Sequence, residues 1–408
     1  MLDQFQKPAA IREVVQKYSD PAAAASAAYQ MAENRLLLPE GKAPQILVGT
    51  PRTLTVWLHM TERCNLRCIY CYLPSGGDTM TEETGLQAVE LAFREAARLG
   101  YRTVKFKYAG GEPTLNFSTV IRIAGAAQVL SRETGISLEG VVLSNGFSLP
   151  DRMIPWLVQT NTQLMISLDG LGMYQDVQRQ RPGGKPTFRY VLRTLDRLDR
   201  FGLKPRISIT VSRHNLPGLP DVLRFVLERG YPFHLNFFRE NPFAQDAASM
   251  SIPPEDLIIG MLAGYQVVEQ CLPEQPLLGA LLDRVRLDIP HNRPCGAAQS
   301  YMIVQPGGSV TLCQMSDERV GDLQMRNPMD AIRRRRDGLL NPMVYDRGRC
   351  GQCFWQYACA GGCPLLTFRT YGRYDHPSPY CSVYQALIPE VLRLEGKRLL
   401  RNEVRSGR

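Results

Sequence analysis

The chain of 408 residues lacks several features that would assign it to a simple class. No stretch approaches the roughly 18 consecutive apolar residues of a membrane-spanning helix, so no membrane partner is expected. Apolar residues make up 44% and charged residues 21%, a composition that excludes a disordered or fibrous chain. The first residues show no basic segment followed by an apolar one, so we predict no secretory signal and expect a cytoplasmic protein.

A strong charge of one sign is also missing. The 48 Lys and Arg residues against 39 Asp and Glu residues give a net charge of +9. Part of this excess lies in residues 393–408, which hold six basic and two acidic side chains. Such a run is usually solvated. We therefore interpret it as a solvated tail and predict no nucleic-acid partner.

Cysteine, by contrast, is abundant, with eleven in the chain. Disulfides do not persist in a reducing cytosol, so this many thiols indicate metal binding, redox chemistry or burial. Three lie within residues 64–71 and seven within residues 295–381. Cys271 stands alone, and a small buried side chain is expected there.

The first group, Cys64, Cys68 and Cys71, has the spacing C-x3-C-x2-C. Three thiolates this close can bind three irons of a [4Fe–4S] cluster and leave the fourth iron open for a small chelating ligand. Zinc is the alternative, because C-x2-C pairs also occur in zinc knuckles. Zinc would need a fourth ligand, and the nearby His59 lies in a predicted strand, where it can equally be a satisfied core residue.

With Tyr70 before its last cysteine, this loop resembles the signature of radical S-adenosylmethionine enzymes. Gly110-Gly111-Glu112-Pro113, which follows a strand-like run, resembles the GGEP motif of the same family. Further family landmarks follow in order at predicted strand ends: residues 143–146, 167–170 and 208–211. The resemblance implies a [4Fe–4S] cluster on the three cysteines that binds S-adenosylmethionine and cleaves it to a 5′-deoxyadenosyl radical.

The resemblance also assigns residues to S-adenosylmethionine. Gly110, Gly111 and Glu112 would orient its methionine amino end. Ser167 and Arg179 are candidates for its ribose and carboxylate, and backbone around Tyr70 would meet the adenine. For Arg179 the alternative is a surface salt bridge. No catalytic acid or base can be singled out.

The second group of cysteines resembles the SPASM domain of peptide-modifying members of the family. The resemblance implies two auxiliary iron–sulfur clusters, the first on Cys295, Cys313 and Cys363. The second would take the other four cysteines, Cys350, Cys353, Cys359 and Cys381. Some members carry an eighth cysteine shortly after the first, but residues 296–301 contain none. The first auxiliary cluster would then have an open iron, which could bind a substrate thiol, or a non-cysteine ligand.

Short β-branched runs alternate with longer amphipathic runs. Strands are predicted over residues 53–60, 103–108, 138–143, 163–168, 205–211 and 233–237, and helices over 81–99, 118–134, 189–201 and 217–228. This alternation predicts an α/β fold with a parallel sheet, and six such units resemble the family's partial (β/α)6 TIM-like barrel. The motifs fall at C-terminal strand ends, where parallel α/β folds gather reactive groups.

We predict five segments along the chain: a helical N-terminal extension (1–48), the barrel (49–252), a bridging helix and linker (253–294), the SPASM domain (295–385) and a basic C-terminal helix or tail (386–408). The extension, with helices predicted over 9–18 and 22–37, weakly resembles part of a leader-peptide-binding winged helix; a structural cap is the alternative. The C-terminal third is poor in long periodic segments. It should therefore bury little apolar core, and metal clusters would organise its fold.

The leading hypothesis is a radical enzyme that matures a ribosomally made peptide through a thioether or C–C cross-link or a related modification. An anaerobic sulfatase-maturing enzyme, which makes formylglycine, is the alternative. Resemblance to the sulfatase-maturing enzymes would imply an Asp base immediately after the second SPASM cysteine, Cys313. This chain has Gln314 at that position. A non-catalytic iron–sulfur electron carrier is a further alternative. Expected partners are a precursor peptide, an electron donor such as flavodoxin or ferredoxin, and a separate leader-binding protein.

Overall fold

The computed structural model describes residues 9–33, 37, 40, 48–74 and 76–406. The chain divides into two compact units, Met1–Val48 and Gly49–Arg408. In the first unit, α1 (Ile11–Val15) and α2 (Pro21–Glu33) pack through Val15, Ala24 and Ala28. α1 is shorter than predicted, and α2 begins one residue before its predicted start; residues 34–36 of the second prediction lie outside the described residues.

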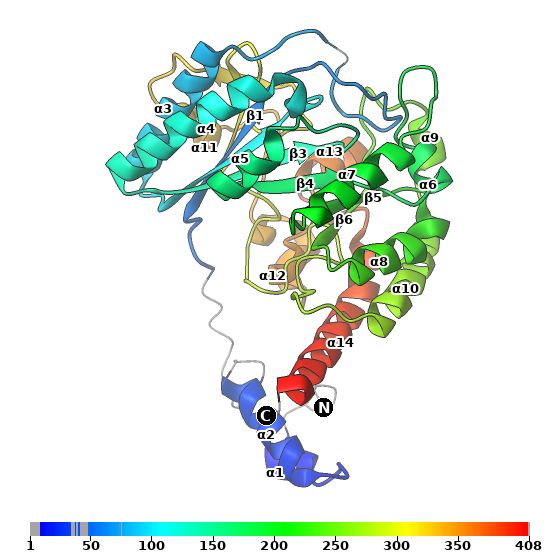
Figure 1. Ribbon diagram of the computed structural model, residues 1–408. Helices are drawn as coiled ribbons and strands as arrows, with labels where there is room; N and C mark the ends of the chain where they lie inside the picture. Colours follow the sequence, from blue (N-terminus) through cyan, green and yellow to red (C-terminus); the bar gives the residue numbers. More distant parts are fainter. Residues whose placement is uncertain (1–8, 34–36, 38–39, 41–47, 75, 407–408) are drawn as a thin grey trace. The chain divides into compact units, whose positions relative to one another are not determined.

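The second unit is built on one sheet of nine strands in the order β6-β5-β4-β3-β2-β1-β7-β8-β9. The first six strands in the chain run parallel: β1 (Thr53–His59), β2 (Thr103–Ala109), β3 (Ser137–Ser144), β4 (Gln163–Ser167), β5 (Arg206–Val211) and β6 (Phe233–Phe237). This sheet, with the cysteine-rich region that follows it, confirms the predicted α/β class (Figure 1).

Helices connect the parallel strands and share a core with them (Figure 1). They are α3 (Glu82–Leu99), α4 (Phe117–Thr134), α5 (Met153–Thr160), α6 (Met173–Asp176), α7 (Phe188–Arg200), α8 (Leu219–Glu228), α9 (Ala247–Met250) and α10 (Pro254–Gln270). The strand β2 alternates in burial: Val104, Phe106 and Tyr108 enter this core. Because successive side chains of a strand point to opposite faces, Lys105 and Lys107 occupy the other face.

The C-terminal third joins the same sheet. Its strands are β7 (Tyr301–Val304), which pairs parallel with β1, and the antiparallel β8 (Ser309–Thr311) and β9 (Arg319–Asp322). Met302, Val304 and Val310 belong to the main hydrophobic core. The expectation that this region buries little apolar core is therefore wrong, because its apolar residues pack against strands formed early in the chain.

Helices complete the C-terminal third: α11 (Pro328–Arg334), α12 (Gln356–Cys359), α13 (Pro364–Tyr371) and α14 (Cys381–Ser406). Arg393 and Lys397 of α14 both pair with Glu269 of α10. Arg398 pairs with Glu395 at 2.7 Å, and both side chains are buried. The predicted solvated tail is thus a packed helix over these residues; the side chains of residues 402–408 lie outside the described part.

Within the described residues, no helix has the length and apolar character needed to cross a membrane.

Candidate active site and cysteine clusters

A cavity of about 1260 Å³ lies at the C-terminal ends of the parallel strands. Its wall includes most of the residues that sequence resemblance assigned to the cofactor: Cys64, Cys68, Tyr70, Cys71, Gly110, Gly111, Ser167 and Arg179. It also includes Tyr301 and Gln314 from the C-terminal third. Pockets for one small molecule are typically about 300–1,000 Å³. The cavity therefore has room for a cofactor and part of a second molecule.

The cysteine loop is anchored from two sides. The Asn145 side chain, after β3, donates from Nδ2 to Asn65 Oδ1 at 2.7 Å and to Cys64 Sγ at 3.7 Å. On the other side, the backbone N–H groups of Arg67 and Ile69 donate to carbonyls of residues 178–180 at 2.6 and 3.0 Å. These bonds hold the loop at the cavity wall in a fixed conformation.

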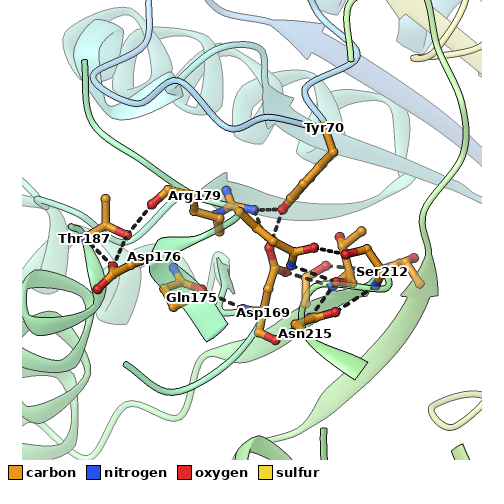
Figure 2. A network of polar contacts seen from close by, with 12 residues as sticks. Tyr70, Asp169, Gln175, Asp176, Arg179, Thr187, Ser212 and Asn215 are labelled. Atoms are coloured by element: carbon orange, nitrogen blue, oxygen red, sulfur yellow. Dashed lines mark hydrogen bonds and ion pairs between the residues drawn. The ribbon is translucent and has the colours of Figure 1, made fainter. Parts of the chain in front are cut away.

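Asp169 and Arg179 form a buried polar pair, and Tyr70, a half-buried residue of the cysteine loop, bonds to both (Figure 2). The Tyr70 hydroxyl donates to Asp169 Oδ2 at 2.5 Å, and Arg179 donates to the same hydroxyl. Arg179 Nη1 lies 3.5 Å from Asp169 Oδ2, and the exposed fractions of the two side chains are 10% and 0%. The alternative of a surface salt bridge for Arg179 is therefore wrong, because its ionic partner is fully buried.

Backbone bonds fix Asp169 in turn. Its Oδ1 accepts from the Thr210 N–H at 2.8 Å, and its carbonyl accepts from Asn215 Nδ2 at 2.6 Å (Figure 2). The Arg179 carbonyl accepts from the Thr187 hydroxyl at 2.6 Å. One hydrogen-bond network thus joins the ends of β4 and β5 to the segment after α6. The sequence showed these segments only as separate landmarks.

The two glycines of the GGEP segment allow the backbone to approach the start of the cysteine loop. A Cβ atom on Gly110, whose φ is 120°, would lie 2.4 Å from the Thr61 carbonyl oxygen. A Cβ atom on Gly111 would lie 2.3 Å from the Arg63 carbonyl oxygen. The Gly111 N–H donates to Thr61 O at 2.7 Å. Any side chain here would push the two loops apart.

Glu112 is fully buried and does not line the cavity. Its Oε2 accepts from the Asn145 N–H at 2.7 Å, and its Oε1 accepts from the Thr114 N–H at 3.1 Å. Burial raises the pKa of this carboxyl, although the hydrogen bonds oppose the shift. The structure thus gives Glu112 protein partners, and a contact with methionine stays a prediction.

The cysteines of the C-terminal third lie in two places. Cys295, Cys313 and Cys363 are within electrostatic range of one another. The other four line one small cavity: Cys350, Cys353, Cys359 and Cys381. In the part of the chain that the structure describes, no three His, Cys, Asp or Glu side chains surround a point suited to a single metal ion.

Burial controls the protonation of these thiols. It raises the pKa of Cys68 and of Cys313 to about 12, and that of Cys359 to about 11. The thiols of Cys68, Cys313 and Cys359 are therefore protonated at neutral pH, and binding of iron would release their protons. Soft sulfur donors in groups of three and four fit iron–sulfur clusters.

The two other residues discussed from the sequence have ordinary surroundings. His59 is buried, and its Nδ1 lies 2.8 Å from Gln305 Oε1. Burial lowers its pKa to about 4. Cys271 is half-buried rather than buried, and its Sγ accepts from Arg224 Nη1 at 3.7 Å.

Sequence reading missed a polar group on the inner faces of the strands. Trp57, Lys107 and His234 line the cavity together with Arg239 and Arg284. Burial lowers the pKa of His234 to about 4, so its ring is neutral. The alternation of lysines with apolar residues along β2 is the signal that could have placed Lys107 inside the barrel.

Comparison with known proteins places this site in a family. Residues 58–223 match the model of the Radical SAM superfamily. Pre-heme d1 synthase of Dinoroseobacter shibae is 29% identical over 46% of this chain and 43% of its own length. GTP 3′,8-cyclase of Stenotrophomonas maltophilia is 31% identical over 46% of this chain and 52% of its own length. The chain thus spans about half the length of such curated relatives.

Other matches cover more of this chain. The serine-type anaerobic sulfatase-maturating enzyme of Klebsiella aerogenes is 20% identical over 74% of this chain and 77% of its own length. The structure of anSMEcpe with bound AdoMet and Cp18Cys peptide aligns with a TM-score of 0.66 and 18% identity, over 84% of this chain and 99% of that one. Streptococcus suis SuiB bound to precursor peptide SuiA aligns with a TM-score of 0.55 and 15% identity, over 89% and 81%.

The fold, the three-cysteine loop and the matched segment agree on a radical S-adenosylmethionine domain over residues 58–223. Residues 58–223 thus form a Radical SAM superfamily domain, and enzymes of that superfamily use a [4Fe–4S] cluster and S-adenosylmethionine.

Proposed function

We propose that the protein is a peptide maturase that abstracts hydrogen from a residue of a ribosomally made peptide and forms a thioether or C–C cross-link. Bond formation would release one further proton, and the accompanying electron would pass to an auxiliary cluster. One observation carries the proposal: the cysteine loop and residues of the C-terminal third line the same large cavity. A peptide segment bound there would reach the cofactor and the first group of auxiliary cysteines together. The similarity in fold to two proteins solved with peptides supports this class of substrate.

Ten cysteines would hold the iron–sulfur clusters: Cys64, Cys68 and Cys71 the one that binds S-adenosylmethionine, Cys295, Cys313 and Cys363 the first auxiliary cluster, and Cys350, Cys353, Cys359 and Cys381 the second. When bound, the first cluster and S-adenosylmethionine supply a 5′-deoxyadenosyl radical. The protein's own residues position the reactants. Gly110 and Gly111 keep backbone N–H groups close to the cysteine loop, and the buried Arg179–Asp169 pair fixes Tyr70 beside Cys71.

Formylglycine formation on a sulfatase is the second candidate. The similarity to a sulfatase-maturating enzyme over 74% of the chain favours it. Against it stands Gln314, whose side chain lines the cavity next to Cys313. An amide cannot accept a proton as a carboxylate base does. The two candidates therefore differ in the chemistry available at one position.

Product analysis separates the two. The enzyme would be co-expressed with the short peptides encoded beside its gene and, separately, with a sulfatase encoded there. A cross-linked peptide loses two hydrogen atoms and does not react with a hydrazide, whereas formylglycine is an aldehyde and does react. We expect the mass loss without hydrazide labelling in the wild type and in Cys271→Ala, and an unmodified peptide with Cys68→Ala. Labelled sulfatase and unmodified peptides would instead establish the second candidate.

A further inference from the structure

Four side chains that line the large cavity carry N–H donors without an acceptor, and we call them the donor cluster: Trp57, Lys107, Arg239 and Arg284. Trp57 Nε1, Arg239 Nε and Arg284 Nε are buried and have no hydrogen-bond partner within the described residues. In the same part of the chain, Lys107 Nζ makes no hydrogen bond or ion pair and lies 4.3 Å from the Trp57 ring centroid. Buried donors in native proteins are normally satisfied. Those three atoms have no access to solvent, so a ligand in the cavity would meet Lys107 Nζ and the exposed part of the Arg284 side chain instead.

The donor cluster also carries excess positive charge. Among the described residues, the carboxylate that pairs with the cluster is Asp283, which pairs with Arg239 and lies 3.8 Å from Arg284 Nε. The exposed fractions of the paired Arg239 and Asp283 side chains are only 7% and 3%. Three cations thus face one anion; Arg239 and Asp283 are buried, while Lys107 and Arg284 are half-buried at the cavity wall. Unpaired buried charge is unfavourable, so the cluster favours a negatively charged ligand.

Neighbouring thiolates would neutralise only part of this charge. Arg284 is within electrostatic range of Cys295 and Cys363. Lys107 is different, because the charged groups that act on it are the cations Lys105 and Arg284. Burial and these cations lower its pKa to about 8. Lys107 is therefore the member of the cluster with an unmatched charge.

We propose that the donor cluster binds a carboxylate of the peptide substrate between Lys107 and Arg284. A carboxylate has two acceptor oxygens and can take charge-assisted hydrogen bonds from an ammonium and a guanidinium together. The group is either an Asp or Glu side chain or the C-terminal carboxylate. This inference rests on the proposed function and specifies the substrate as an acidic peptide segment held beside the first auxiliary cysteines.

The test measures peptide affinity rather than turnover. Three five-residue peptides of Gly, Ser and Cys with acetylated N-termini are titrated calorimetrically into anaerobic holoenzyme with S-adenosylmethionine. The first has a central Glu and an amidated C-terminus, the second a central Gln and a free C-terminus, and the third a central Gln and an amidated C-terminus. One of the first two peptides should bind about tenfold more tightly than the third, because a hydrogen bond to a charged group contributes an affinity gain of about that size. The tighter one identifies the source of the carboxylate.

Variants then test whether the tighter binding of the carboxylate-bearing peptide, here called the carboxylate preference, depends on the donor cluster. Lys107→Met should abolish it, and Lys107→Arg, which keeps the charge, should retain it. Lys105→Met is the matched control, because Lys105 lies on the same strand but pairs with Glu139 at 2.8 Å and is outside the cavity lining. It should leave the preference unchanged.

Equal or undetectable binding of all three peptides, or a preference that survives in Lys107→Met, would overturn the carboxylate site. Formation of 5′-deoxyadenosine by the same preparation is measured in parallel. If it forms while the preference is absent, only the carboxylate site fails. If the wild type forms none, the proposed function fails as well.

Discussion

The Arg179 guanidinium lies 3.5 Å from the Asp169 carboxylate, and the two side chains form an ion pair with almost no access to water. Asp169 follows β4, while Tyr70, which bonds to the same carboxylate, directly precedes Cys71. The pair thus connects the cysteine loop to the C-terminal edge of the sheet (Figure 2). These contacts anchor the cysteine loop at Tyr70.

Replacement of Asp169 by Ala should destabilise the protein strongly. Arg179 would remain buried without its anion, and such a loss typically costs about 3–5 kcal/mol of the free energy of unfolding. Denaturant unfolding of both proteins measures this difference. A change below about 1 kcal/mol would show that water or another group compensates Arg179.

An exposed pair provides the control for that experiment. Arg122 Nε lies 2.8 Å from Glu82 Oε1, but the exposed fractions of these side chains are 68% and 44%. Glu82→Gln should change the free energy of unfolding by no more than about 1 kcal/mol, because solvent screens the pair.

Gly111→Ala should impair S-adenosylmethionine cleavage. Its Cβ would lie 2.3 Å from the Arg63 carbonyl oxygen, so the backbone next to the cysteine loop must move. Displacement of reacting groups by about 1 Å can reduce the rate about 10²-fold. Gly125→Ala is the control, because Gly125 lies in α4 with no atom within 4 Å of an added Cβ. It should keep the rate and stabilise the fold by about 0.5–1 kcal/mol. Equal rates in both variants would contradict the positioning role of Gly111.

The carboxylate preference should decline as pH rises through about 8. Lys107 has a pKa of about 8, and its ammonium carries the charge only below that value. A bound carboxylate favours the ammonium, so the midpoint for the complex lies at or above 8. The groups around it do not titrate in this range: Trp57 is uncharged, Arg284 stays protonated, and His234, with a pKa of about 4, stays neutral. Affinity of the three peptides in wild type and in Lys107→Arg from pH 7 to pH 9 checks this. Parallel curves in the two proteins would exclude Lys107 as the titrating group.

Iron content should report the three groups of cysteines separately. Cys68→Ala and Cys359→Ala should each lose the iron of one cluster and keep that of the other two. Cys271→Ala should lose none, because Cys271 lines neither cysteine cavity. Iron and sulfide analysis after anaerobic reconstitution gives the result. Unchanged iron in Cys359→Ala would argue against the second auxiliary cluster.

Local pattern was enough to predict the parallel sheet and the chemistry-bearing loops. Residues 233–237, for example, form the strand as predicted, and the GGEP segment follows β2. The pairing of β7 with β1 was not predictable in this way. The pairing places Tyr301 beside Thr55. A strand of 4 residues is too short to show a periodicity, so the sequence could not indicate a parallel partner that is distant along the chain.

The same difference between local and distant contacts explains which residues of the site could be predicted. Cysteine spacing is local, so the sequence indicated which thiols belong together. Lys107 lies on β2 and Arg284 in the segment after α10, and only the folded chain brings them to one cavity. Arg179 depends on Asp169, whose burial no sequence pattern indicated.

The central claim is that the cavity at the cysteine loop generates a radical from S-adenosylmethionine, and the most direct measurement is 5′-deoxyadenosine. Reconstituted enzyme is incubated anaerobically with dithionite and S-adenosylmethionine, and the product is quantified by chromatography. Wild type and Cys271→Ala should form 5′-deoxyadenosine at similar rates, and Cys68→Ala should form none. The account is contradicted if wild type with a full complement of iron forms none, or if Cys68→Ala forms as much as wild type.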